Sequence, residues 1–316
     1  MRKHLIKLLI IVLAMMLLHT TLSAQKPLEN SLLWRISGKK LTQPSYLYGT
    51  IHLICVQDFI LRGQTIEAMN KCQRIAFEMD FFNKQDMTNA LQQYMLTDTD
   101  SYKRWLEEKD YQRLRHFMTT TLFIPDSIWT KTRPPLLVRR MIGKMLDCMK
   151  TGAEDVVIGV SRRDNETRGY NHEFTGLETT EDRTKLGVTA PKFDSLLTQS
   201  IVAMIPYWKK IQADLRRAAQ EYKAENIIGT MQSLASEPLL ASQPSSKEYT
   251  KTLLDARNKL WLPRIEKMMT AKPTFFAVGA GHLVGDNGVI MLLRKQGYTV
   301  EPITKREQVI GRTQGK

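Results

Sequence analysis

The sequence predicts an α/β fold, with α+β as the alternative, built around a mixed central sheet. Short apolar segments of strand length alternate with amphipathic segments of helical length. A strand that runs into a GxxH motif occurs twice, at residues 49–52 and 279–282, and each time a helix and a strand follow. We therefore expect two half-units side by side in one sheet, with a helical insertion packed on it as a cap.

The composition divides the chain into three parts. Residues 1–24 carry basic residues before a short apolar run and end in small residues, which is typical of a cleaved signal peptide, although an uncleaved anchor is the alternative. Residues 25–304 are predicted to form a single domain, whose helical insertion covers about 84–150 and 190–232. The basic residues 305–316 are expected to form a disordered tail.

Each predicted element depends on a local pattern. Alternating or continuous apolar residues between turn residues indicate strands at 32–36, 45–48, 74–77, 170–175, 274–278 and 298–303. Helical periodicity predicts helices at 63–71, 102–118, 155–165, 192–205, 207–231, 248–269 and 288–295.

Three details of this pattern refine the prediction. Asp100 is expected to cap the helix that follows it. Met141, Met145 and Met149 repeat every four residues, which predicts a stripe of core side chains. The polar residues 236–247 contain two prolines and predict a loop or mobile flap.

The chain is strongly basic, with a formal net charge of +14. Its basic residues are spread along amphipathic helices among acidic neighbours, and no aromatic-basic nucleic-acid motif occurs, so we expect no nucleic-acid partner. The export signal places the protein in the periplasm or outside the cell. A peripheral contact with an anionic envelope surface fits the charge there, and solvated helix faces without a partner are the alternative.

Three cysteines occur, Cys55, Cys72 and Cys148. In an oxidising compartment they allow at most one intramolecular disulfide. Cys55 and Cys72 are the nearer pair in sequence, but the sequence does not fix the pairing.

The two GxxH motifs are the strongest indication of chemistry. His52 and His282 each leave the carboxyl end of a predicted strand, where open α/β sheets form their clefts. Glu78 and Glu178 also lie at strand ends and reach the same edge if all these strands share one sheet. Two histidines with one or two glutamates can bind Mn²⁺, Co²⁺ or Zn²⁺ and leave a position open for water. Histidines that close turns and carboxylates that cap helices or pair with arginine are the alternative.

Further motifs occur in a defined order between residues 32 and 303. They are 33–36, 44–53, 77–80, 176–179, Arg257 with Asn258, 276–283, Gly288, and Gly297 with Tyr298. Together they resemble the TraB/GumN family, relatives of the Tiki proteins. The resemblance implies a fold similar to that of the erythromycin-esterase and ChaN group. It also implies metal-dependent hydrolysis, as in the Tiki proteases, which use paired GxxH motifs, a glutamate and Mn²⁺ or Co²⁺.

The resemblance also implies a role for each site residue. His52 and His282 would be metal ligands, and Glu78 a ligand or a general base. Glu178 would be a ligand or a carboxylate behind the ligands. Arg257 and Asn258 would face the same cleft and orient the substrate or stabilise an oxyanion. One departure is Ala256, because many relatives resemble Glu-Arg-Asn at this point.

The sequence therefore predicts an exported metal-dependent hydrolase, specifically a Tiki-like metallopeptidase that acts on a peptide or protein. The alternative is a non-catalytic envelope protein that binds and sequesters a peptide, haem or a metal. A third interpretation is an envelope scaffold whose histidines only close turns.

Overall fold

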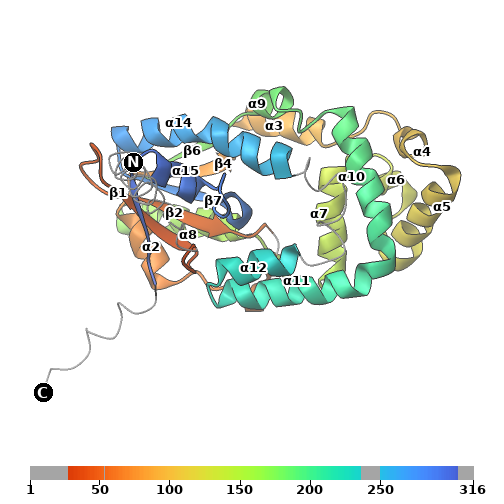
Figure 1. Ribbon diagram of the computed structural model, residues 1–316, viewed down its shortest axis with the longest axis horizontal. Coiled ribbons are helices and arrows are strands. Elements are labelled where there is room, and N and C mark those ends of the chain that lie inside the picture. Colours follow the sequence, from red (N-terminus) through yellow and green to blue (C-terminus); the bar gives the residue numbers. More distant parts are fainter. Residues whose placement is uncertain (1–27, 53, 236–249, 305–316) are drawn as a thin grey trace, which may run out of the picture.

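The structure, a computed structural model, describes residues 28–52, 54–235 and 250–304 (Figure 1). The predicted signal peptide, the predicted flap at 236–247 and the basic tail lie outside these residues. Among the described residues, no helix is both long and apolar enough to cross a membrane.

The architecture is α/β, as predicted, with a mixed six-stranded sheet. The strands β6, β4, β7 and β2 are adjacent and parallel, whereas β1 is antiparallel to both β2 and β8. Their bounds, in the order of the sheet, are β6 (Glu173–Glu178), β4 (Arg74–Met79), β7 (Thr274–Gly279), β2 (Ser45–Thr50), β1 (Leu33–Ser37) and β8 (Thr299–Pro302). The carboxyl ends of four strands therefore meet at one edge of the sheet.

The two strands that precede the GxxH motifs are neighbours in this sheet. Thr50 at the end of β2 pairs with Gly279 at the end of β7. Every residue of both strands is buried, which explains why both are largely apolar along their length instead of alternating. Figure 1 shows α14 along one face of the sheet and α2 and α8 on the other. Their bounds are α2 (Gly63–Asn70), α8 (Ala153–Arg168) and α14 (Ala256–Ala271), and α15 (Val289–Lys295) packs against α14 and β8.

A second hydrophobic cluster forms away from the sheet. Tyr102 and Trp129, both fully buried, meet there edge to face with ring centroids 5.1 Å apart. Figure 1 shows its helices at the end of the molecule beyond the sheet. They are α4 (Ser101–Trp105), α5 (Glu108–His116), α6 (Asp126–Trp129), α7 (Pro134–Met145), α10 (Pro191–Met204) and α11 (Trp208–Lys223). The helices α3 (Lys84–Gln93), α9 (Thr180–Lys185) and α12 (Ile227–Leu234) complete the described helical part. The domain boundaries stay a prediction.

Three details of the predicted helical segments are wrong. The helix expected at 102–118 is split, because Leu106 and Glu107 are extended and separate α4 from α5. The side chain of Asp100 makes no capping hydrogen bond. The stripe of methionines stops early, since α7 ends at Met145 and Met149 is 74% exposed.

The disulfide joins Cys55 to Cys148, not to the nearer Cys72. Cys72 is a buried free thiol that follows α2 and donates to the carbonyl of Ala68, so it packs in the core under the sheet. The bond closes a loop of 93 residues, which in the chain-entropy account contributes roughly 4–5 kcal/mol of stability. A disulfide of this kind supports an oxidising, extracytoplasmic location.

Asp182 joins two layers of the fold. Thr179 and Asp182 form a capping box at the start of α9, and Asp182 also accepts two hydrogen bonds from Arg264 of α14, at 2.7 and 2.9 Å. The hydrogen bond from Arg264 is the main reason why the pKa of Asp182 is lowered to about 2.

We predict that Asp182→Asn destabilises the protein by about 2 kcal/mol near neutral pH. Because the folded pKa lies below the unfolded value of about 3.9, this contribution is complete above that value and is lost as the pH falls from about 4 to 2. Urea unfolding should show a constant difference between pH 7 and 5 that shrinks below pH 4. Glu181→Gln, an exposed change on the same helix, is the control. A difference that persists undiminished at pH 3 would contradict the proposed ion pair.

Candidate active site at the carboxyl edge of the sheet

The predicted site residues lie at one edge of the sheet. His52 follows β2 by two residues, Glu78 is the penultimate residue of β4, and Glu178 is the last residue of β6. His282 ends the short 3₁₀ turn η6 (Ala280–His282) that follows β7. The four strands that carry them are parallel, which is why residues so far apart in sequence converge.

Glu78 lies between the two imidazoles. Its Oε1 atom is 4.0 Å from Nε2 of His52 and 3.7 Å from Nε2 of His282. Oε1 accepts from the backbone N–H of Gly279 at 2.8 Å, and Oε2 accepts from Nη2 of Arg257 at 2.6 Å. Burial alone would raise the pKa of Glu78, but the charge and hydrogen bond of Arg257, together with the charge of His52, outweigh burial and hold that pKa well below its usual value. Glu78 is therefore a carboxylate near neutral pH.

His282 is rigidly held and neutral. Only 3% of the residue is exposed, and its ring lies 4.3 Å from that of Trp261. Nδ1 is 2.7 Å from Oδ1 of Asn258, whose amide N–H groups are donated to two backbone carbonyls. Since this amide oxygen can only accept, Nδ1 carries the proton and Nε2 is left with its lone pair. Burial lowers the pKa of His282 to about 3, so it stays uncharged.

His52 has a different environment. Its side chain is 56% exposed, and its Nδ1 is 3.0 Å from Oε1 of Glu154. Partial desolvation lowers the pKa of His52, but the hydrogen bond and charge of Glu154, with the charge of Glu78, outweigh it and raise the pKa to about 9. Glu154 also accepts a short hydrogen bond from the hydroxyl of Thr50. Sequence analysis missed Glu154, whose only signal is its place at the start of a predicted helix.

Glu178 lies behind Arg257, and its side chain is fully buried. It accepts from Nε and Nη2 of Arg257 at 2.7–3.0 Å, and Nε1 of Trp261 donates to it at 2.9 Å. Arg183 donates to it at 3.3 Å. Both oxygens are thus engaged, so the geometry favours the predicted role behind the ligands over that of a ligand.

Arg257 and Asn258 lie on α14 and contact His282, and Arg257 also contacts Glu78. A π-helical turn, η5 (Lys251–Asp255), precedes them, and such turns are frequent at functional sites. Arg257 is buried, and its Nη1 lies 3.0 Å from Nε2 of His282, to which it donates. Asn258 acts through His282, whose proton it fixes.

The donor atoms fit a divalent metal ion in their chemistry. Nε2 of His52, Nε2 of His282 and Oε1 of Glu78 are donor atoms of the types found in catalytic metal sites with three protein ligands. Each histidine is held at Nδ1 by an oxygen acceptor, as metal-bound histidines usually are. However, within the described ranges no three His, Cys, Asp or Glu side chains are arranged so that they could hold a metal ion, and Arg257 donates to the lone pair of His282. A bound ion therefore requires Arg257 to release that nitrogen.

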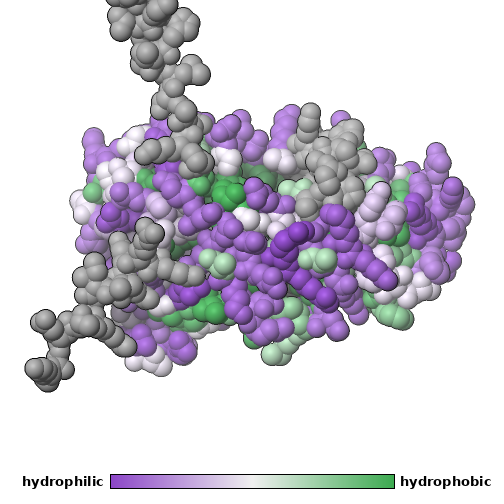
Figure 2. Space-filling model, turned by 60° about the horizontal axis from the view of Figure 1, so that its bottom comes forward, coloured by the Kyte–Doolittle hydropathy of each residue, from purple (hydrophilic) through white to green (hydrophobic). Residues whose placement is uncertain are grey.

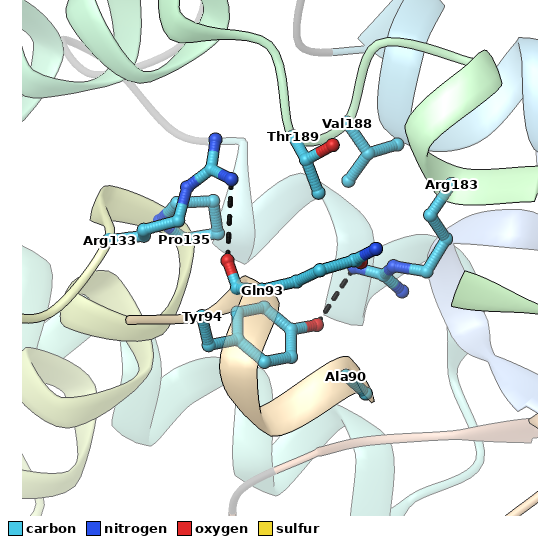
Figure 3. A pocket seen from close by; sticks show the side chains of 8 residues that line it. All are labelled: Ala90, Gln93, Tyr94, Arg133, Pro135, Arg183, Val188 and Thr189. Carbon is cyan, nitrogen blue, oxygen red and sulfur yellow. Dashed lines mark hydrogen bonds between the residues drawn. The ribbon is translucent and has the colours of Figure 1, made fainter. Parts of the chain in front are cut away.

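A separate small pocket, shown in Figure 3, contains neither histidine. Its volume of about 10 Å³ is room for roughly one water molecule. Arg183 links it to the site, because this residue donates to the hydroxyl of Tyr94 at 2.8 Å as well as to Glu178. The residues that line it are Ala90, Gln93, Tyr94, Arg133, Pro135, Arg183, Val188 and Thr189.

Comparison with known proteins identifies metalloproteases among the relatives of this chain. The chain is 23% identical to a metalloprotease TIKI homologue of Nematostella vectensis, over 89% of this chain and 68% of that protein. It is 24% identical to human metalloprotease TIKI1, over 89% of this chain and 63% of the relative, and 24% identical to TIKI2 of Danio rerio, over 92% and 65%. The chain thus spans about two thirds of the length of these relatives. No solved structure gives a significant match. Residues 32–302 match the TraB/PrgY/gumN family, and the chain therefore belongs to that family.

Proposed function

We propose that this protein is an exported metal-dependent hydrolase, specifically a Tiki-like metallopeptidase. The observation that carries the proposal is the position of Glu78, a buried carboxylate within 4.0 Å of Nε2 of both GxxH histidines. The relatives named above are metalloproteases, which supports the same assignment.

His52, His282 and Glu78 would hold a divalent ion, Mn²⁺ or Co²⁺, with Zn²⁺ as the alternative. When bound, such an ion lowers the pKa of a water molecule so that hydroxide is available near neutral pH. Arg257 places a fixed positive charge beside these ligands, where it can stabilise an oxyanion of the substrate. Glu178 holds Arg257 in that position.

The exposure of the site residues indicates the side from which a substrate reaches them. His282, Glu78 and Arg257 are each at most 8% exposed, whereas the side chain of His52 is 56% exposed. We therefore place the peptide or protein substrate on the His52 side of the site. We propose the periplasm or the cell exterior as its location. Contact with an anionic envelope surface is still a prediction, and so is the expectation that the protein has no nucleic-acid partner.

The alternative function is a non-catalytic envelope protein that sequesters a peptide, haem or a metal. One observation favours it: both oxygens of Glu78 already accept hydrogen bonds, so this carboxylate is not free to act as a general base.

We predict that Mn²⁺ or Co²⁺ stabilises the wild-type protein and that His52→Ala abolishes this effect. Metal at 100 times its Kd adds about 2.7 kcal/mol, which raises Tm by several degrees. The measurement is a thermal-shift series with metal content determined on the purified protein. His116→Ala, an exposed histidine on α5, is the control and should respond like the wild type. An unchanged metal response in His52→Ala would rule His52 out as a ligand.

We predict that Glu78→Gln lowers the cleavage of a peptide library by at least about 10²-fold, because it removes the charged donor between the histidines. Mass spectrometry of the products gives the rate, and Tm confirms that the variant is folded. Glu173→Gln, at the opposite end of the parallel strands, should cleave normally. If the wild type binds peptide without turnover and Glu78→Gln binds equally well, the binding alternative is correct.

A further inference from the structure

A disulfide clamp joins the two segments that meet at His52. We use this name for the Cys55–Cys148 bond together with the strand pair β3 (Ile54–Cys55) and β5 (Lys150–Thr151). Within it, the N–H of Val56 donates to the carbonyl of Met149 at 2.9 Å. The clamp closes next to the site, because Cys55 is three residues after His52 and Cys148 is six residues before Glu154.

Backbone contacts continue from the clamp to the site itself. The N–H of Ala153 donates to the carbonyl of Ile51 at 2.9 Å. Ala153 directly precedes Glu154, and Ile51 directly precedes His52. A Cβ atom at Gly152 would lie 3.0 Å from the carbonyl oxygen of His52, closer than ordinary contacts. The two backbones therefore approach each other closely at this point.

His52 lacks the supports that hold His282. Its backbone lies beyond the end of β2 outside any helix or strand, and its side chain is half exposed. Among the described residues, the close polar contact that orients its ring is the one of 3.0 Å from Nδ1 to Glu154. Glu154 in turn is 8% exposed, is fixed by the hydroxyl of Thr50 and lies in the first turn of α8, where the helix dipole favours a carboxylate.

We propose that Glu154 is a positioning residue for His52 and that the disulfide clamp keeps these two side chains in register. Glu154 accepts the Nδ1 proton of His52, so that in the neutral ring the Nε2 lone pair lies on the side of Glu78. This inference rests on the proposed function only in that His52 is taken as a ligand. The proposal has one further consequence. A dithiol reductant supplies two electrons and two protons, which convert the Cys55–Cys148 bond into two thiols while the dithiol becomes a disulfide. We expect this reduction to loosen the segments around His52 and to leave His282 unaffected.

Long-range ¹H–¹⁵N NMR of the metal-free protein tests the proposal, because it reports which ring nitrogen carries the proton. The spectra are recorded in a pH series that extends until the ring of His52 is neutral, and its signals are assigned by their loss in His52→Gln. We expect the Nδ1–H form in the wild type and the Nε2–H form in Glu154→Ala. Glu154→Gln keeps an acceptor oxygen and should retain Nδ1–H. The signals of His282 should be the same in all variants, which shows that the fold is intact.

The clamp is tested by the double variant Cys55→Ser/Cys148→Ser, with Cys72→Ala as the control. We expect His52 of the double variant to shift towards Nε2–H and the control to match the wild type. A wild-type His52 in the Nε2–H form, or an unchanged form in Glu154→Ala, overturns the positioning role. A double variant identical to the wild type overturns the role of the clamp.

A Co²⁺ titration separates this inference from the proposed function. Glu154→Ala should weaken Co²⁺ binding about 10- to 100-fold, as loss of an acceptor behind a ligand usually does. If the wild type binds no Co²⁺ but the proton positions change as expected, the metal-dependent function fails and the positioning role stands. If Co²⁺ binds equally to both proteins and the proton positions are unchanged, the positioning role fails and the function stands.

Discussion

The buried guanidinium of Arg257 constrains the whole arrangement of the site. It lies between carboxylates from neighbouring strands, Glu78 of β4 and Glu178 of β6. Removing three such charges from water costs several kcal/mol per ion, and only their close pairing offsets that cost. The three charged side chains come from β4, β6 and α14. Their pairing therefore requires both the observed register of β4 against β6 and the observed position of α14 over the sheet. The loss of Arg257 would leave two buried carboxylates without the cation that they share.

The two GxxH motifs are alike in sequence but not in environment. His282 is enclosed by Trp261 and Asn258 and is neutral, whereas His52 is half exposed and beside the charge of Glu154. One half of the site is thus built into the core, and the other half is attached to a surface segment. A site of this kind combines a rigid ligand position with an accessible one, which suits a substrate that approaches from solvent.

The sheet and its polar edge were predictable because they follow from local patterns. The repeated strand and GxxH pattern predicted two half-units side by side in one sheet, and the convergence of His52, His282 and Glu78 was expected if their strands shared that sheet. The role of Glu154 and the pairing of Cys55 with Cys148 were not predictable, since both depend on contacts between residues about 100 positions apart. The periodicity of apolar residues along the sequence does not reveal contacts between such distant residues. The same holds for the interruption of the predicted helix at 102–118, where tertiary packing overrides local propensity.

Competition for Glu78 explains why a second buried carboxylate is needed. A divalent cation at this site would compete with Arg257 for the carboxylate of Glu78. Arg257 makes one hydrogen bond to Glu78 but donates from both Nε and Nη2 to Glu178. It can therefore give up Glu78 and remain paired in the interior, so the cost of an isolated buried charge is avoided. In the proposed function, Glu178 would thus allow Glu78 to exchange a protein partner for a metal ion.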